Sequence, residues 1–368
     1  MTEQNIRSPR VRRAASGKRW VYFALLLALV AVGGVGRDTA AAAKQSATAS
    51  GWVDVADLPA NLHMGHPTRA LCKHKTYRIG LEFWGDQDPF ALTNIASFRQ
   101  VAGQLGCVQF VGPLFDATDP SKVIENMQTF VERKVDGVVL ALIVPATQPG
   151  AVRILKQANV KVLSIYVPIP NTTFLDEDDV DSGYKMGREL ISRFLAKYPG
   201  KTPYVIFGGL RSVPAAVGRE QGFDKALKKL MPHLPKDHYT EVEVAGDPVV
   251  ANRATAAALA KIPKDALILA PAIDDQSAFG MLKAAHAAGY TGRVMAWAQG
   301  GSPAGLRFIC GDPDFIGTIA YQPEKWGIYV LPAIMDVING KQLPASIRQP
   351  TIAVTKANMA TYYPHACS

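Results

Sequence analysis

A repeated alternation of short apolar runs and helical segments constrains the fold of this 368-residue chain more than any other feature. Tyr77–Phe83 is a short apolar strand pattern, and Phe90–Leu105 has helical spacing that is closed by Gly106. The next predicted strands are Val108–Phe115, Val138–Val144 and Lys161–Val167, and the helices between them run from Asp119-Pro120 to near Lys134 and over Gly150–Ala158. Near-continuous apolar strands between helices are typical of a parallel sheet that is covered on both faces. The pattern therefore predicts an α/β fold.

An acidic stretch at residues 176–181 interrupts this alternation, which then restarts. A charge run of this kind is most often a solvated crossover, and we expect one here. The second set of predicted strands is Tyr204–Phe207, Thr240–Val244, Ala266–Ala270, Arg293–Trp297 and Phe315–Tyr321. The repeat of the pattern and the length of the chain predict two lobes.

The first 43 residues have the pattern of a removable export signal. A basic segment precedes the apolar run Val21–Val35, and residues 39–43 offer several small-residue cleavage sites. The run is shorter than the ~20 apolar residues that a membrane span needs, although an uncleaved anchor is the alternative. We expect cleavage near Lys44 and export of the mature protein from the cytoplasm.

Loss of this segment changes the charge of the chain. Residues 1–43 carry seven Lys or Arg and two acidic residues, so the net charge falls from +9 to +4. This is an ordinary surface balance, and we expect no nucleic-acid partner.

All four cysteines lie in the mature part of the chain, where the oxidising compartment allows two disulfides and three possible connectivities. Cys72 and Cys107 each come just before one of the first two strands, so both would lie at the same edge of a parallel sheet. Cys310 would then pair with Cys367, and buried free thiols are the alternative. The cysteine spacing does not predict a metal site.

Short motifs follow several of the predicted strands in a characteristic order. The first are Asp88-Pro89-Phe90, residues 116–122 and residues 135–139; the later ones are residues 219–223, Asp274-Asp275, residues 317–321 and residues 339–341. In order and spacing, from about Tyr77 to Thr355, they resemble the type I periplasmic substrate-binding proteins, in particular the ribose-binding-like branch that serves ABC sugar importers. The resemblance implies two Rossmann-like lobes, each a parallel sheet flanked by helices, joined by three hinge crossings.

The resemblance also implies the bounds of these lobes. The crossings would lie near residues 176, 322 and 348. The N-terminal lobe would be residues 76–176 plus 323–348, and the C-terminal lobe residues 177–322 plus 349–368. Residues 44–75 would form a separate lead-in without a clear period.

In this family the ligand lies outside the carboxyl ends of the strands. The corresponding candidates in this chain are Trp84, Asp88, Phe90, Tyr166, Arg219, Asp274, Trp297, Gln299 and Tyr321. Their rings could stack on a sugar while the carboxylates and the amide take its hydroxyls. The same rings with two carboxylates would suit a methylated amine, and a mostly apolar lining would suit an apolar solute. Each ring could instead be core packing, Asp274 a helix cap, and Arg219 an internal ion-pair partner.

The sequence lacks the motifs of common enzymes, including G-x-S-x-G, the P-loop and H-E-x-x-H, and its seven histidines are scattered. We therefore expect no enzyme, no cofactor and no metal. The predicted function is that of a monomeric periplasmic solute-binding protein of an ABC transporter. It would capture a carbohydrate or polyol by hinge closure and deliver it to a permease in the inner membrane. The alternatives are a periplasmic sensor for a histidine kinase, or a carrier of a methylated amine or a mostly apolar ligand.

Overall fold

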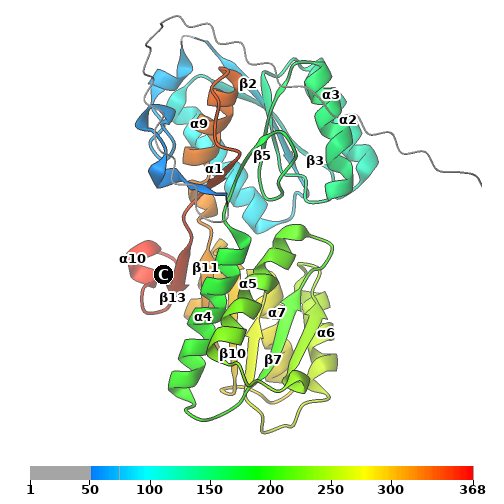
Figure 1. The fold of residues 1–368 in the computed structure, drawn as a ribbon, viewed down its shortest axis with the longest axis vertical. Coiled ribbons are helices and arrows are strands. Elements are labelled where there is room, and N and C mark those ends of the chain that lie inside the picture. The colour runs from blue at the N-terminus through cyan, green and yellow to red at the C-terminus, as the bar shows by residue number, and fades with distance from the viewer. Residues whose placement is uncertain (1–50, 74, 368) are drawn as a thin grey trace, which may run out of the picture. The chain divides into compact units, whose positions relative to one another are not determined.

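The computed structural model describes residues 51–73 and 75–367, and the predicted export signal lies outside these residues. No helix of the described part is long and apolar enough to cross a membrane. The strands of this part form two sheets, one of seven strands and one of six (Figure 1). We call each sheet with its flanking helices a lobe.

The first lobe has the strand order β1-β12-β6-β5-β4-β2-β3, and each neighbouring pair is parallel. Its strands are β1 Val53–Asp54, β2 Tyr77–Phe83, β3 Val108–Phe115, β4 Gly137–Leu140, β5 Lys161–Ser164, β6 Thr173–Asp176 and β12 Ser346–Arg348. Helices α1 (Pro89–Leu105) and α9 (Gly327–Ile338) cover one face, and α2 (Pro120–Glu132) and α3 (Gln148–Gln157) cover the other. The apolar residues of the central strands are thus buried on both sides, as their near-continuous apolar pattern predicts.

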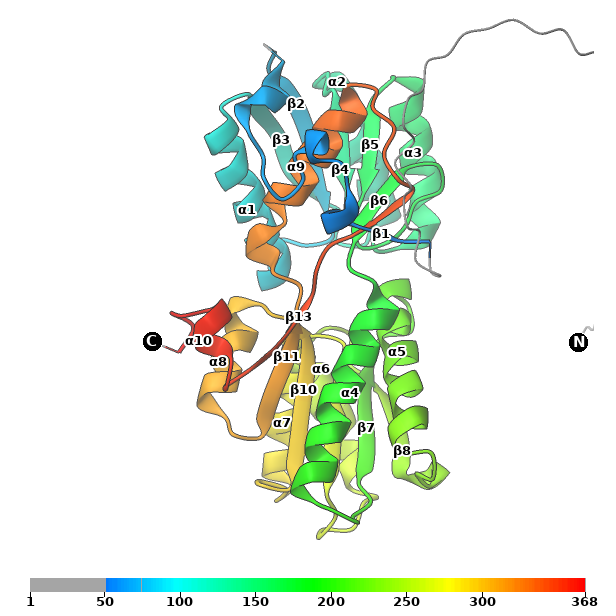
Figure 2. The same cartoon turned by 60° about the vertical axis from the view of Figure 1, so that its left-hand side comes forward.

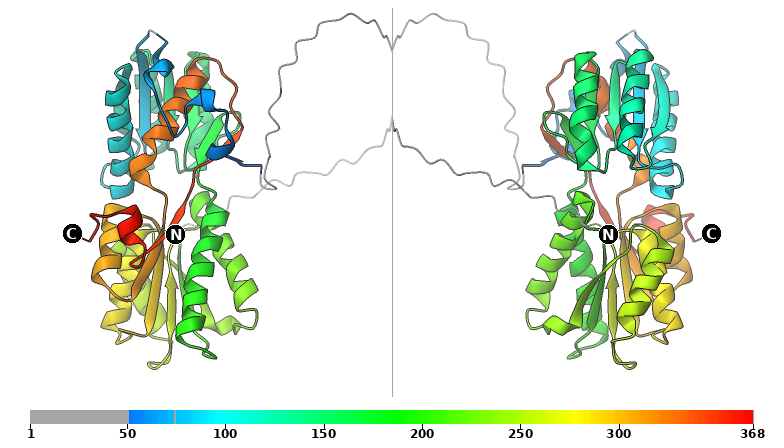
Figure 3. Two further views of the ribbon diagram at one scale, coloured as in Figure 1. Left: turned by 90° about the vertical axis from the view of Figure 1, so that its left-hand side faces the viewer. Right: turned by 90° about the vertical axis from the view of Figure 1, so that its right-hand side faces the viewer.

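The second lobe has the strand order β13-β11-β10-β9-β7-β8. Its strands are β7 Tyr204–Gly209, β8 Tyr239–Glu243, β9 Ile268–Pro271, β10 Val294–Gly300, β11 Phe315–Ala320 and β13 Ile352–Thr355, and β13 alone runs antiparallel to its neighbour. Its helices are α4 Asp179–Lys197, α5 Pro214–Leu230, α6 Pro248–Leu259, α7 Asp275–Ala287, α8 Pro303–Gly311 and the short α10 Met359–Tyr362. Helix α4 packs on α5, and α6 packs on α7. Helices flank the sheets of both lobes (Figure 3).

The helices α1, α2 and α6 begin with the same dipeptide, Asp-Pro. The carboxylates of Asp88, Asp119 and Asp247 accept hydrogen bonds from backbone N–H groups of the first helical turn. The proline after each of them has a φ angle that already suits a helix and lacks the N–H group that would have no partner there. Helix α1 then ends at Gly106, whose φ of 73° is easy only for glycine.

Two strands of the first lobe end earlier than predicted. Strand β4 ends at Leu140 rather than Val144, and a 3-10 turn begins at Pro145. Strand β5 ends at Ser164 rather than Val167, because Tyr166 has a φ of 65°, which no strand can contain.

Both disulfides have the predicted connectivity. Cys72 bonds to Cys107 with a Cα–Cα distance of 5.8 Å, and Cys310 bonds to Cys367 with a Cα–Cα distance of 5.5 Å. The first bond joins the segment before β2 to the residue before β3, and the second joins α8 to the C-terminal segment.

The described part of the predicted lead-in is built into the first lobe. Val53 pairs with Ile347 of β12, and Asp54 pairs with Arg348 through Nε–Oδ1 and Nη2–Oδ2 contacts of 2.5 and 2.9 Å. Short 3-10 turns then lead to β2. The lead-in therefore supplies an edge strand of the sheet. This strand was not predicted, because the sequence of the lead-in has no clear period.

Within the described residues the chain passes between the two sheets three times: from β6 to α4, from β11 to α9, and from β12 to β13 (Figure 2). The first passage contains the acidic stretch, which is a crossover as predicted but is not solvated at its start. Asp176 ends strand β6, and both Asp176 and Glu177 are only 1% exposed. The charge of Glu177 is instead met inside the protein by Arg219.

Candidate functional site

A cavity of about 570 Å³ lies where the carboxyl ends of strands from both sheets meet. It includes eight of the nine candidate residues: Trp84, Asp88, Phe90, Tyr166, Arg219, Asp274, Gln299 and Tyr321. The first four follow strands β2 and β5 of the first lobe, and the others belong to the second lobe. This position agrees with the rule that α/β proteins hold ligands outside the carboxyl ends of parallel strands.

Trp297 is the candidate that does not line the cavity. Strand β10 continues to Gly300, three residues beyond its predicted end, so Trp297 lies inside the sheet rather than at its exit. Its ring is fully buried, packs against Gly317 and lies near Arg193 of α4. Trp297 is therefore a core residue of the second lobe.

Aromatic side chains form one wall of the cavity. Trp84 meets Tyr166 edge-on with ring centroids 4.8 Å apart, and Phe90 lies 6.0 Å from Tyr166 and 6.1 Å from Tyr321. Trp326 stacks on Tyr166 at 4.7 Å and is itself fully buried. The rings fix one another in place, and together they present an apolar surface to the cavity.

Carboxylates at helix N-termini form a second group of lining residues. Asp88 caps α1 and also accepts a hydrogen bond of 3.0 Å from the indole Nε1 of Trp84. Asp274 caps α7 and accepts bonds of 2.7 and 3.0 Å from the backbone N and Oγ of Ser277. Burial raises the pKa of Asp274, and the negative charge of Asp88 raises it further, whereas the bonds from Ser277 lower it. Asp88 of the first lobe and Asp274 of the second thus line the same cavity, and the charge of Asp88 acts on Asp274.

Arg219 lines the cavity, but its charge is already paired within the second lobe. Its Nε donates to Oδ1 of Asp179 at 2.8 Å, its Nη2 to Oε1 of Glu177 at 3.2 Å, and its Nη1 to the Ile273 carbonyl at 2.9 Å. The guanidinium also lies 4.8 Å from the ring centroid of Tyr321. Burial raises the pKa of Asp179 to about 7, although the charge of Arg219 opposes the shift. Through these bonds Arg219 connects the wall of the cavity to the segment of the chain that passes first between the lobes.

Gln299 and Tyr321 are joined by a buried hydrogen-bond network. The Tyr321 hydroxyl donates to Oε1 of Gln299 at 2.6 Å, and the Ser182 hydroxyl donates to the same oxygen at 2.8 Å. Both polar groups are thus engaged by their own lobe, so they shape the cavity wall more than they offer free hydrogen-bonding capacity.

Several polar residues of the lining were not predicted as site residues: Gln87, Thr118, Asp247, Asp275, Gln276 and Ser302. Asp247 has a visible signal, since Asp247-Pro248 repeats the Asp-Pro helix start that marks Asp88 and follows a predicted strand in the same way. Asp275 is buried and accepts bonds from Ser302 and Thr318. Burial raises the pKa of Asp275 to about 6 despite these bonds.

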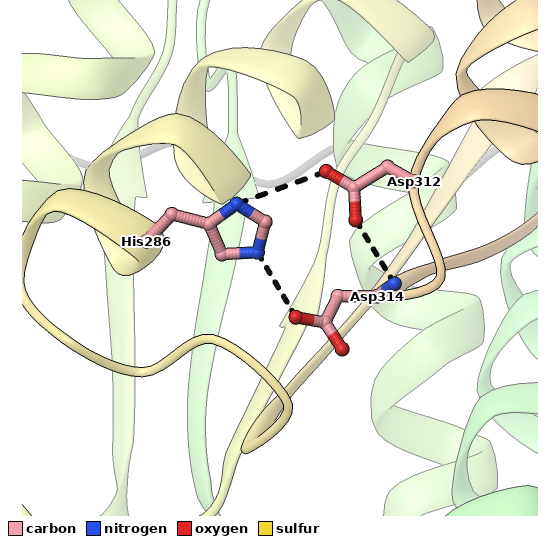
Figure 4. Close-up of side chains that lie close together, drawn as sticks. All are labelled: His286, Asp312 and Asp314. Atoms are coloured by element: carbon pink, nitrogen blue, oxygen red, sulfur yellow. Dashed lines mark hydrogen bonds and ion pairs between the residues drawn. The ribbon is translucent and has the colours of Figure 1, made fainter.

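A second cluster of titratable side chains lies outside the cavity lining (Figure 4). His286 of α7 lies between two aspartates, with Nε2 3.0 Å from Asp314 and Nδ1 3.7 Å from Asp312. Asp314 also accepts a 2.7 Å bond from the backbone N of Gly292. These contacts tie α7 to the segment before β11, and one possible ligand atom of each of the three side chains lies within 4.8 Å of the others.

Solved structures of solute-binding proteins share the fold of this chain. An ABC transporter periplasmic solute-binding protein from Actinobacillus succinogenes with bound D-allose is 16% identical, with a TM-score of 0.67 over 78% of this chain and 100% of that chain. The Caulobacter myo-inositol binding protein bound to myo-inositol is 19% identical, with a TM-score of 0.67 over 78% and 96% of the two chains. The fructose-binding periplasmic domain of a hybrid two-component system is 21% identical, with a TM-score of 0.65 over 77% and 92%.

These likenesses confirm the predicted fold class, two lobes of parallel sheet flanked by helices. No curated protein matches the chain by sequence. Residues 79–342, more than half of the chain, match the periplasmic binding protein domain family. Its members bind solutes without chemical conversion, so the prediction that the chain is not an enzyme is confirmed. The chain belongs to the periplasmic binding protein family.

Proposed function

We propose that this chain is the solute-binding protein of an ABC transporter. It captures a small solute, a carbohydrate or polyol, in the cavity between the lobes and delivers it to a membrane permease. The observation that carries this proposal is the cavity itself, because its lining joins rings and carboxylates from the first lobe to polar groups from the second. One solute can therefore contact both lobes at once.

Such contacts explain how binding would be signalled to a partner. A solute that touches Asp88 and Phe90 on one lobe and Asp274 on the other binds best when the lobes are close together. It therefore shifts the population toward the closed arrangement, and the passages between the sheets supply the hinge. A permease that recognises this arrangement would accept the loaded protein over the empty one.

The wall chemistry supports a polyhydroxylated ligand. The rings of Trp84, Phe90 and Tyr166 offer apolar faces, and the carboxylates of Asp88 and Asp274 accept hydrogen bonds from hydroxyl groups. Hydrogen bonds to a charged group contribute about 1.5–3 kcal/mol each. Solved relatives of the same fold hold D-allose and myo-inositol, which supports this class.

The proposal includes the predicted export and lobe bounds. The mature protein would begin near residue 44, remain monomeric in the periplasm, and divide into residues 76–176 plus 323–348, to which strand β1 of the lead-in adds, and residues 177–322 plus 349–368. Mass spectrometry of the exported protein tests the cleavage point, since an uncleaved chain would retain the mass of residues 1–43.

A thermal-shift screen of the exported protein against sugars, polyols, methylated amines and apolar solutes tests the function. A ligand at about 100 times its Kd stabilises the folded state by about 2.7 kcal/mol, which gives a clear rise in Tm. We expect a rise with a sugar or polyol that is lost in Phe90→Ala. Tm values that stay unchanged with every sugar and polyol would reject the carbohydrate assignment.

A second candidate function is a ligand sensor for a histidine kinase. The observation in its favour is the likeness to the periplasmic domain of a hybrid two-component system. The two functions share the same body, so the neighbouring genes discriminate between them. Permease and ATPase genes beside this one favour import, and genes for a kinase and a response regulator favour sensing.

A further inference from the structure

The cavity lining carries more negative than positive charge. Its acidic residues are Asp88, Asp247, Asp274 and Asp275, and Arg219 is the only basic residue among the described residues that line it. The Arg219 charge is not available to a ligand as a free cation, because Asp179 and Glu177 already pair with it.

The four lining carboxylates are not equivalent. Asp275 is fully buried and accepts hydrogen bonds from Ser302 and Thr318, which bind it to its own lobe. Asp88, Asp247 and Asp274 instead cap helices, and none of them takes part in an ion pair among the described residues. These three carboxylates line the cavity without a salt bridge to a cationic side chain of the described residues, although the charge of Arg219 acts on Asp274 and lowers its pKa.

The helix N-termini offset only part of this charge. A helix N-terminus acts as about half a positive charge. The N-termini of the three helices therefore compensate about half of the negative charge that their three capping carboxylates would carry. About one and a half negative charges remain around the cavity. Burial is the main cause of the raised pKa of Asp274; the charge of Asp88 adds to it, and the charge of Arg219 opposes it.

The same caps remove a feature that anionic ligands use. Free N–H groups at a helix N-terminus attract phosphate or carboxylate, but the first-turn N–H groups of α1, α6 and α7 already donate to Asp88, Asp247 and Asp274. An anionic solute at these helix N-termini would therefore face carboxylates, whereas an anion-binding site needs free N–H donors.

We infer that the solute carries a protonated or quaternary ammonium group, which lies between the carboxylates of Asp88 and Asp274 and beside the aromatic wall. This inference rests on the proposed function, since it names the charge of the solute bound by the same cavity. The ammonium could belong to an amino sugar or to a methylated amine. Both would gain from the rings as well, because a cation over an aromatic face is attracted to it.

Titration calorimetry near pH 7 with probes that differ in charge tests the inference. One set is D-glucosamine, D-glucose and D-glucuronate; the other is choline and its neutral isostere 3,3-dimethylbutan-1-ol. We expect the cation of at least one set to bind at least tenfold more tightly than its neutral counterpart, and D-glucuronate to bind weakest of the sugars. The sugar set and the choline pair distinguish the two sources of the ammonium group.

Three substitutions connect the preference to the carboxylates. Asp88→Asn and Asp274→Asn keep an acceptor for the helix cap but remove the charge, so we expect the ratio of cation to neutral affinity to fall toward one. Asp119→Asn is the matched control, because Asp119 caps α2 through the same Asp-Pro motif and does not line the cavity. The control should leave the ratio unchanged.

A cation that binds no more tightly than its neutral counterpart in both sets overturns the inference, including the case in which no probe binds. A cation preference that survives both Asp88→Asn and Asp274→Asn overturns it as well. Failure of the proposed function has a different signature. Binding of a neutral sugar without charge preference would keep the carbohydrate assignment and reject the ammonium, whereas binding of choline alone would do the reverse.

Discussion

The Nε of Arg219 donates to Oδ1 of Asp179 at 2.8 Å, and this bond joins the wall of the cavity to the first residue of α4. Asp179 follows the first passage between the lobes, and Glu177 within that passage is bound to the same guanidinium. A single charged group therefore contacts the cavity and stabilises the segment that leads from one lobe to the other.

Replacement of Arg219 should destabilise the protein. In Arg219→Met, Glu177 and Asp179 remain buried without their cation, and removal of one partner from a buried ion pair costs about 3 kcal/mol or more. Urea denaturation would measure the loss of unfolding free energy. Arg188→Met is the control, since the Arg188 side chain is 53% exposed beside Glu189 and its loss should cost less than about 1 kcal/mol. A loss no larger for Arg219→Met than for the control would show that the pair is not important for stability.

Truncation of Trp297 should mainly lower stability, whereas truncation of Phe90 should mainly lower ligand affinity. Trp297→Ala removes a fully buried ring, which should lower the unfolding free energy by about 3–5 kcal/mol. Phe90→Ala removes a partly exposed ring of the cavity wall, so we expect a small loss of stability and a large loss of ligand affinity. Denaturation and calorimetry on both variants would test this. Equal affinity of Phe90→Ala and the parent protein would exclude this ring from the binding site.

Glu82 should make stability depend on pH. It is fully buried on β2, and burial raises its pKa to about 9, although the bond from Asn126 lowers it and Asp116 raises it further. Between its ordinary pKa of 4.5 and about 9 the folded protein holds a proton that the unfolded chain has released, so this residue's contribution to stability falls as the pH rises.

The Glu82→Gln variant isolates this effect. The unfolding free energy of the variant minus that of the parent should rise with pH across this window, with a slope approaching about 1.4 kcal/mol per pH unit. Urea denaturation from pH 5 to pH 9 would measure the slope. Glu132→Gln, at the exposed end of α2, is the control and should give no slope. A flat difference for Glu82→Gln would mean that Glu82 is ionised in the folded protein.

Both disulfides should stabilise the fold substantially. They close loops with sequence separations of 35 and 57 residues, for which the chain-entropy estimate is roughly 4 kcal/mol each. The paired variants Cys72→Ser with Cys107→Ser, and Cys310→Ser with Cys367→Ser, should therefore each lower the denaturation midpoint. Addition of a reductant should lower the midpoint of the parent and leave a variant that lacks both bonds unchanged. Equal midpoints with and without reductant in the parent would contradict the expectation.

The sequence predicted those parts of the fold that depend on local pattern. The bounds of β2 and β3 follow from apolar runs that end at turn residues, and the starts of α1 and α2 follow from Asp-Pro. Strands β6, β12 and β13 were not predicted. They have only three or four residues each, and their pairing partners lie far along the chain, as for Ser346 with Phe174.

The candidate site shows the same limit. Residues that directly follow a strand could be placed near the cavity, but Trp297 could not, because its position depends on how far β10 continues. The ion-pair partners of Arg219 could not be predicted from the sequence either. Glu177 and Asp179 lie about forty positions away, and they appeared in the sequence only as part of an acidic run.

The last passage between the lobes limits how they can move. Strand β12 ends at Arg348 and β13 begins at Ile352, so only residues 349–351 join these strands of the two sheets. A link of this length lets the Cα atoms of Arg348 and Ile352 separate by at most about 14 Å, and Pro350 fixes one of its φ angles. The Gln349 backbone N also donates to the Asp176 carbonyl at 2.9 Å, which joins this tether to the first passage. We therefore expect the cavity to open by a pivot about the tether, with the widest displacement at the rim farthest from it.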